Sequence, residues 1–82
     1  MKLIARKPVR IILERGESSW LAENSRLDIY ATGATTQEAI EEFVAHVINF
    51  YRHYRELNRS DATGNALMLK QLFEDSFTEA SE

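Results

Sequence analysis

The stretch "TGATTQEAIEEF", residues 32–43, decides the fold, because it contains both a turn and the start of a helix. Thr35 stands three residues before Glu38, which is the spacing of a capping box. In that arrangement each side chain accepts a hydrogen bond from a backbone N–H group at the helix start. We expect Gly33 to supply unusual backbone dihedral angles for the turn that leads out of a preceding strand.

The glycine and the threonines of this stretch also raise the alternative of a phosphate-binding loop. Such a loop needs several glycines, and usually a lysine, at the N-terminus of the helix. Here Gly33 stands alone, and Glu38, Glu41 and Glu42 place negative charge where an anion would bind. The pattern favours a capped helix, and we expect no nucleotide or other cofactor.

Apolar residues recur at helical spacing after this start, at positions 40, 43, 44, 47, 48, 51 and 54. The spacing predicts a long helix from about Thr36 to Leu57. Its apolar arc spans about half of the circumference, which is wider than packing against a sheet requires. We therefore expect the surplus apolar surface to contact either the C-terminal segment or another subunit.

Three short segments upstream alternate in hydrophobicity with a period of two, which is typical of strands. They are "PVRIILERG" (8–16), "WLAEN" (20–24) and "SRLDIYATG" (25–33), and "GESS" (16–19) has the composition of a hairpin turn. Three such strands form an antiparallel meander. A sheet of this size needs a cover on one face to be stable.

The C-terminal part contains "ALMLKQLFEDSF" (66–77), with Leu69, Leu72, Phe73 and Phe77 at helical intervals. We expect a short second helix over 65–77, although "ALMLK" is also compatible with a strand. The last five residues, "TEASE", are expected to fray. The predicted fold class is α+β: a three-stranded antiparallel meander packed by one long helix, with a short C-terminal helix.

The composition is that of a small folded protein. With 82 residues we expect one domain, 1–82, whose core lies within 8–57; so short a chain buries a thin core, which favours pairing with another chain. The absence of cysteine excludes disulfides, thiolate metal sites and cysteine nucleophiles. The first ten residues lack the long apolar region of a signal peptide, and no segment is apolar enough to span a bilayer, so we expect a cytoplasmic protein.

The strongest candidate for a metal site is the pair His46 and His53, with Glu42 and Asn49 on the same side of the predicted helix. The two histidines are two turns apart, about 10 Å along the axis, which is too far for both to reach one ion. The serines lie in predicted turns without a nucleophile elbow. We expect no metal, no catalytic residue and no enzymatic activity.

A basic N-terminal arm gives a second class of function, the binding of nucleic acid. Its residues Lys2, Arg6, Lys7 and Arg10 could contact phosphates. The formal net charge of −3 opposes such binding for the chain as a whole. Nucleic-acid binding is therefore kept as the alternative.

The order of these parts resembles the HicB-like family, the antitoxins of HicA–HicB toxin–antitoxin pairs and their single-domain relatives. Alternating strands, an aromatic-x-Ala element and a glycine turn that opens an amphipathic helix carry the likeness, within residues 9–57. The matching residues are Trp20, Ala22, Leu27, Gly33, Thr36, Glu38, Ala39 and Ile40.

The resemblance implies a β-β-β-α core without catalytic residues that binds and masks a small ribonuclease toxin and forms dimers or higher oligomers. Many members also add a DNA-binding segment at the C-terminus. Here residues 59–82 are few and acidic, which argues against DNA binding. Many members have a Leu-Pro-Gly-Cys-like turn where this chain has Leu27, Asp28 and Ile29.

Large apolar and aromatic side chains dominate protein interfaces, so they are the candidate anchors for a partner. The candidates are Trp20, Tyr30, Phe50, Tyr54 and Leu57. The predicted function is a non-catalytic protein-binding module; the alternatives are the nucleic-acid binder and a structural homodimer without a toxin partner.

Overall fold

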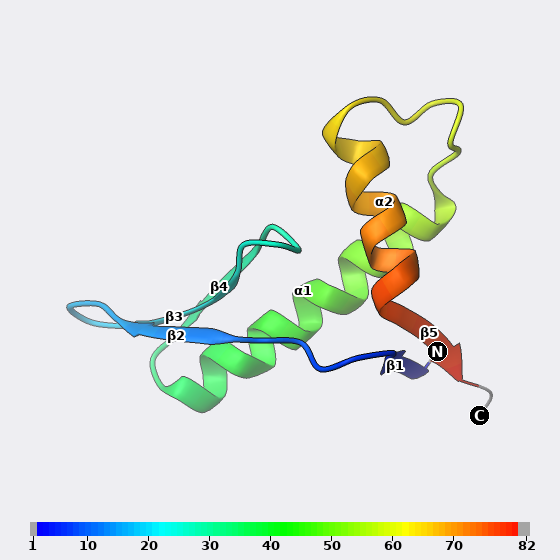
Figure 1. Cartoon of the computed structure of the whole chain (residues 1–82). Coiled ribbons are helices and arrows are strands. Elements are labelled where there is room, and N and C mark those ends of the chain that lie inside the picture. Colours follow the sequence, from blue (N-terminus) through cyan, green and yellow to red (C-terminus); the bar gives the residue numbers. More distant parts are fainter. Residues whose placement is uncertain (1, 81–82) are drawn as a thin grey trace. The chain divides into compact units, whose positions relative to one another are not determined.

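The computed structural model describes residues 2–80 of the chain. The elements are β1 (Lys2–Ala5), β2 (Ile12–Arg15), β3 (Trp20–Asn24), β4 (Ile29–Gly33), α1 (Thr36–Glu56), α2 (Asn65–Ser76) and β5 (Phe77–Ala80) (Figure 1). They form two compact units, Val9–Val47 and Met1–Pro8 with Ile48–Glu82. The predicted α+β class and the three-stranded antiparallel sheet are confirmed, and a second sheet of two strands was not predicted.

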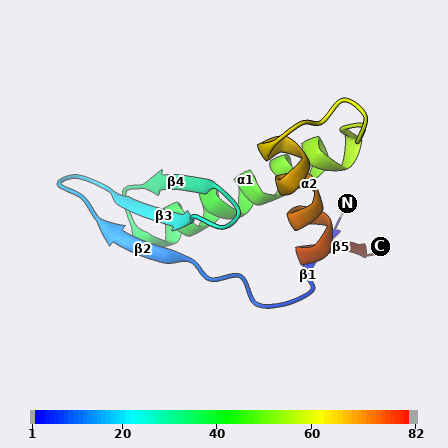
Figure 2. The same cartoon turned by 45° about the horizontal axis from the view of Figure 1, so that its top comes forward.

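The unit Val9–Val47 contains the predicted meander, with strand order β2-β3-β4 (Figure 2). Leu13 lies opposite Ala22, which in turn lies opposite Ala31. The first hairpin closes where the Gly16 N–H group donates to the Ser19 carbonyl at 2.8 Å. β2 and β4 are shorter than the segments 8–16 and 25–33 predicted for them.

The second turn explains why β4 begins only at Ile29. The Leu27 N–H group donates to the Asn24 side-chain oxygen at 2.9 Å, and Asp28 has a φ of 57°. This left-handed conformation is strained for most side chains but accessible to aspartate. The turn directs Leu27, which is 4% exposed, into the core.

One face of this sheet packs on the first half of α1. Ala22 and Ala31 from the sheet are buried, and so are Ala39, Phe43 and Val47, spaced four residues apart on the helix. Side chains at that spacing share a face of a helix. The small alanines allow the helix and the sheet to lie close together, which leaves the opposite face of the sheet for other contacts.

Gly33 is required for a reason other than the predicted one. The described glycine with a positive φ is Gly64, so the expectation of unusual dihedral angles at Gly33 is wrong. A Cβ atom on Gly33 would lie 2.4 Å from the Ala39 backbone nitrogen and 2.7 Å from the Glu38 carbonyl carbon. Glycine is needed because the end of β4 lies directly against the first turn of α1.

The predicted capping interaction is present at the start of α1. The Glu38 N–H group donates to Thr35 Oγ1 at 3.1 Å, and the Ala34 N–H group donates to Glu38 Oε2 at 2.9 Å. The glutamate therefore reaches one residue further back than in the usual capping box, where it accepts from the N-cap residue itself. Two N–H groups at the end of β4 and the start of α1 are satisfied by these side chains.

Removing this cap should weaken the protein measurably. We expect Thr35→Ala to lower the free energy of unfolding by about 1 kcal/mol, because the Glu38 N–H group loses its acceptor. Urea denaturation followed by circular dichroism measures the loss. Thr36→Ala, one residue into the helix, is the matched control and should change stability by less than about 0.5 kcal/mol.

The second unit contains the end of α1, the helix α2, and a sheet of two antiparallel strands formed by the chain ends. Ala5 lies opposite Phe77, and Leu3 lies opposite Glu79. Residues 65–70 are helical, which excludes the alternative of a strand there. α2 ends at Ser76 and β5 follows at once, so the prediction of a frayed tail is wrong for residues 78–80; residues 81 and 82 lie outside the described residues.

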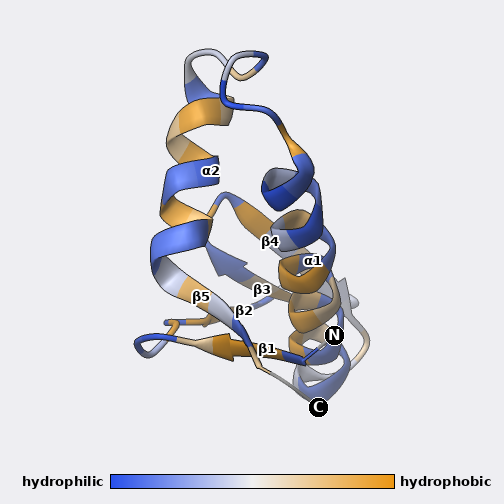
Figure 3. Cartoon of the chain, turned by 90° about the vertical axis from the view of Figure 1, so that its right-hand side faces the viewer, coloured by the Kyte–Doolittle hydropathy of each residue, from blue (hydrophilic) through white to orange (hydrophobic). Residues whose placement is uncertain are grey.

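Aromatic rings form the core of this second unit. Phe73 and Phe77 have ring centroids 5.7 Å apart, Tyr51 packs edge-on against Phe77, and Tyr54 lies 5.2 Å from Phe73. Apolar and polar stretches alternate along the ribbon of α2 (Figure 3). Leu69 and Phe73 of this helix, four residues apart, are both buried. The C-terminal segment thus meets part of the surplus apolar surface that the sequence predicted for the long helix.

Candidate functional site

The face of the β2–β3–β4 sheet that points away from Ala22 and Ala31 carries exposed apolar side chains. Ile12 and Tyr30, which are 44% and 50% exposed, lie on either side of Glu23 in one cross-strand row. In the next row Leu21, which is half-buried, lies between Glu14 and Thr32. We call this surface the open face; its residues are Ile12, Glu14, Leu21, Glu23, Tyr30 and Thr32.

The two edges of this sheet differ in what contacts them. At β4, the Tyr30 carbonyl lies 3.0 Å from Nδ1 of His46 on α1. A carbonyl only accepts, so Nδ1 of His46 carries the proton and donates it. Nε2 of the same ring lies 3.8 Å from Glu42. The helix α1 therefore holds the β4 edge, and the other edge of the sheet is β2.

β2 is exposed along its whole length, since each of its residues from Ile12 to Arg15 is an exposed residue. Ile12 and Leu13 place apolar side chains on opposite faces of this strand. An edge strand with exposed backbone and apolar side chains is a template for pairing with another strand. Glu14 and Arg15 put charges on the same strand, which limits indiscriminate association.

The predicted anchors in this unit, Trp20 and Tyr30, lie on opposite faces of the sheet. Trp20 is half-buried on the face of Ala22, and the Arg15 guanidinium lies 5.8 Å from the centre of its ring. That distance suits a cation–π contact. Tyr30 belongs to the open face, so these two residues do not form one contact surface.

The predicted anchors in the second unit belong to or border its core. Phe50 is 40% exposed and its ring stacks on that of Tyr54, with centroids 6.4 Å apart. Tyr54 packs in turn on Phe73, and Leu57 is half-buried. The structure brings Phe50 and Tyr54 together, but it commits much of Tyr54 to packing within this unit.

The basic residues of the alternative function are exposed, and one of them also holds the fold together. Arg6 Nε donates to the Phe77 carbonyl at 3.2 Å. The backbone N–H group of Arg6 donates to the Ser76 carbonyl at 2.8 Å. Lys2 lies in β1, and Lys7 and Arg10 lie between β1 and β2. Binding of nucleic acid by this arm stays a prediction.

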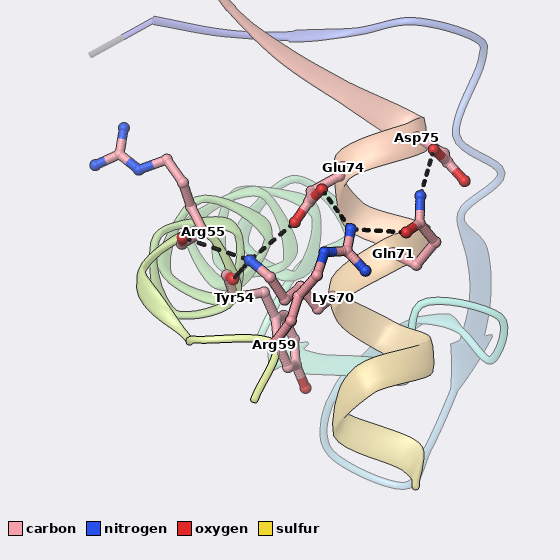
Figure 4. Close-up of polar contacts among 7 residues, drawn as sticks. All are labelled: Tyr54, Arg55, Arg59, Lys70, Gln71, Glu74 and Asp75. Carbon is pink, nitrogen blue, oxygen red and sulfur yellow. Dashed lines mark hydrogen bonds and ion pairs between the residues drawn. The ribbon is translucent and has the colours of Figure 1, made fainter. Parts of the chain in front are cut away.

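A polar cluster joins α2 to the end of α1 in the second unit (Figure 4). Its centre is Lys70, which is 6% exposed and whose ammonium lies 2.6 Å from the Tyr54 carbonyl, 3.5 Å from the Arg55 carbonyl and 2.8 Å from Glu74 Oε1. The last carbonyls of a helix have no partner within the helix. An ammonium has three protons to donate, and Lys70 finds three acceptors here. Its role is structural, because no proton or lone pair is left for chemistry.

Arg59 extends this cluster into the loop between the helices. Its Nη2 donates to Gln71 Oε1 at 2.8 Å and to Glu74 Oε2 at 3.1 Å (Figure 4). The hydrogen bond from Lys70 holds the pKa of Glu74 below its ordinary value. The positive charges of Lys70 and Arg59 act in the same direction, whereas partial burial opposes them.

This lowered pKa predicts a stability that depends on pH. A carboxylate whose pKa is depressed by folding stabilises the protein above its unfolded value, ordinarily 4.5, and that contribution is lost as the pH falls through the folded value. We expect the difference in unfolding free energy between wild type and Glu74→Gln to shrink from neutral pH to about pH 3. A difference that is constant over this range in urea titrations would contradict this account of the cluster.

The metal site considered for His46 and His53 is not formed in the described part of the chain. Within residues 2–80, no three His, Cys, Asp or Glu side chains are grouped so as to hold a metal ion. His46 contacts Tyr30 and Glu42, while His53 packs on the ring of Tyr54 at 5.0 Å. Among the same residues, no helix combines the length and the low polarity needed to cross a membrane.

Two features were not predicted from the sequence: the exposure of Ile12 on the open face and the burial of Lys70 in the polar cluster. Ile12 was recognised as a strand residue, but its exposure at a free edge depends on the order of the strands. Lys70 interrupts the apolar run "ALMLKQLF" (66–73), and that interruption is the signal that could have marked it as a buried, partnered charge.

Residues 2–80 therefore form a small α+β fold with two antiparallel sheets, two helices and an exposed strand at the edge of the larger sheet. Comparison of the chain with protein-family models, with curated proteins and with solved structures gave no match.

Proposed function

We propose that the chain is a non-catalytic protein-binding module, similar to a HicB-type antitoxin, that self-associates and masks a small ribonuclease toxin. The observation that supports this most strongly is the open face of the β2–β3–β4 sheet. Ile12 and Tyr30 are large, apolar or aromatic, and exposed on it. Exposed side chains of this kind on a rigid sheet are the usual anchors of protein interfaces.

The charges on this face indicate what kind of partner it suits. Glu23 lies between Ile12 and Tyr30, and Glu14 lies beside Leu21 in the next row. Carboxylates interspersed with apolar anchors are complementary to a basic protein surface. A ribonuclease that binds RNA phosphates presents such a surface, so the open face would compete with RNA for it.

The test is co-expression with the product of a neighbouring gene of toxin size or, where there is none, with a HicA-type ribonuclease toxin. We expect the wild-type chain to bind the toxin and to relieve growth arrest. Tyr30→Ala and Glu23→Lys should each weaken binding at least about tenfold, since each removes or reverses a contact at the centre of the face. Met68→Ala, at an exposed position of α2, is the matched control and should bind like wild type.

Three outcomes would overturn the proposal. The first is unchanged binding by both open-face variants. The second is a dimer that does not bind the toxin, which would support a structural homodimer. The third is binding to single-stranded RNA that weakens steeply with salt and with replacement of Lys2, Arg6 and Lys7, which would support the nucleic-acid alternative.

A further inference from the structure

We infer that two copies of the chain form a symmetric dimer by antiparallel pairing of their β2 strands, with the two Ile12 residues opposite each other on the two-fold axis. This deepens the proposed function, because it specifies how the module self-associates. It rests on the edge of the sheet, whereas toxin masking rests on the open face. Ile12 and Glu14 belong to both, so variants at Arg10 and Tyr30 are needed to separate the two.

The backbone of β2 leaves a defined set of groups available for pairing. The Gly16 N–H group donates to Ser19, and the Arg10 carbonyl accepts from the Asn24 side chain at 2.8 Å. Even-numbered residues of this strand therefore direct their N–H and C=O groups toward β3. Neighbouring residues of a strand point these groups in opposite directions. Leu13 and Arg15 thus direct theirs outward, and Ile11 does so if the strand is extended by pairing.

The side-chain faces restrict how two such strands can pair. Paired residues of an antiparallel ladder place their side chains on the same face of the sheet. In a two-fold symmetric pair of strands, the residue on the axis faces its own copy. Any of the four residues of β2, Ile12 to Arg15, can lie there if the exposed strand is to overlap with itself.

Charge selects among these four registers. With Glu14 or Arg15 on the axis, two like charges face each other, which is unfavourable. With Leu13 on the axis, Glu14 faces Ile12 of the other copy, so its carboxylate has no opposite charge across the ladder. With Ile12 on the axis, Glu14 faces Arg10 of the other copy, and symmetry repeats that pair. Opposite charges directly across a ladder stabilise the pairing, so β2 is complementary to itself in this register.

The same register also matches the apolar residues. The two Ile12 side chains meet on the open face, and each Leu13 meets Ile11 of the other copy on the face toward the helix. The six strands form one continuous sheet in which the two open faces lie side by side. The pairing is closed, because each copy uses the same edge and α1 contacts the β4 edge through His46.

A charge-reversal experiment tests the register. Glu14→Arg places two arginines opposite each other, and Arg10→Glu places two glutamates opposite each other. We expect each single variant to weaken the dimer at least about tenfold in sedimentation equilibrium. The double variant carrying both changes should restore dimerisation, because the pair is re-formed with its signs exchanged. Circular dichroism checks that each variant remains folded.

Single cysteines provide a second, independent test, since the chain has none of its own. In the proposed register the Cα atoms of the two Ile12 residues are about 4.5 Å apart, within the range of a disulfide. Those of the two Leu13 residues are about 7 to 8 Å apart, too far for one. Ile12→Cys should therefore cross-link rapidly on mild oxidation. Leu13→Cys and the control Thr32→Cys should cross-link slowly.

Each result decides the inference. Rapid cross-linking of Leu13→Cys in preference to Ile12→Cys would overturn the register, and so would a failure of the double charge variant to recover. A wild-type chain that sediments as a monomer at submillimolar concentration would overturn the dimer. Toxin binding by a monomeric Arg10→Glu variant, which leaves the residues of the open face unchanged, would leave the proposed function standing. A dimer that does not bind the toxin would leave this inference standing alone.

Discussion

Lys70→Met is expected to lower the free energy of unfolding by about 2 to 3 kcal/mol, the cost of removing a charged hydrogen-bond donor from a buried site. The variant leaves the Tyr54 and Arg55 carbonyls at the end of α1 without this donor and leaves Glu74 without its closest cation. Methionine fills a similar volume, so the loss reports on hydrogen bonds and charge more than on packing. Urea denaturation at neutral pH measures it.

Two further variants make this prediction specific to the cluster. Lys7→Met removes an exposed lysine and should change stability by less than about 0.5 kcal/mol. Combining Lys70→Met with Glu74→Gln should destabilise less than the sum of the two single changes, because the carboxylate is no longer left without its cation. Strict additivity, or a loss no larger than that of Lys7→Met, would show that Lys70 does not connect the two helices.

Gly33→Ala is expected to destabilise the protein by about 3 kcal/mol, at the upper end of the range for overpacked sites. The added methyl group would meet backbone atoms of Glu38 and Ala39, the nearest at 2.4 Å, and backbone yields less readily than the end of a flexible side chain. The first turn of α1 would have to move away from β4, which would also disturb the cap at Thr35. Thermal unfolding followed by circular dichroism would show a lower midpoint.

The matched control for this variant is Gly16→Ala in the first hairpin. There the nearest atom to the added methyl group is the Ser19 carbonyl oxygen at 3.3 Å, a contact that a small shift relieves. We expect this control to cost less than about 1 kcal/mol. Equal losses for the two glycines would contradict the close approach of β4 and α1 as the reason for Gly33.

The start of α1 could be predicted well because its determinants are local. Thr35 and Glu38 lie three residues apart, and their side chains form the hydrogen bonds that this spacing predicts. The apolar spacing predicted a helix that in fact ends one residue before Leu57. The need for glycine at position 33 was explained wrongly, because the close approach of β4 and α1 cannot be read from the residues that flank the glycine.

The second sheet could not be predicted because its determinants lie at opposite ends of the chain. β1 and β5 are four residues each, too short to show a clear period of two. Their pairing joins residues more than seventy positions apart, such as Ala5 and Phe77. Local pattern carries no information about such a pairing, so "TEASE" had the composition of a frayed end although residues 78–80 form a strand.

The candidate surface was predictable only in part. Tyr30 was identified as an anchor from its residue type, and the structure places it on the open face. Tyr54 was selected by the same reasoning, but it packs on Phe73 of a helix whose position the sequence does not reveal. Ile12 became a candidate only when strand order placed β2 at the edge.

Amide hydrogen exchange at Leu13 tests the free edge of β2 most directly, because its N–H group points outward and has no acceptor in the β2–β3 ladder. Self-pairing predicts that this amide becomes protected as the protein concentration rises, and that Glu14→Arg abolishes the protection. An amide that exchanges at the rate of an exposed group at every concentration would contradict the account.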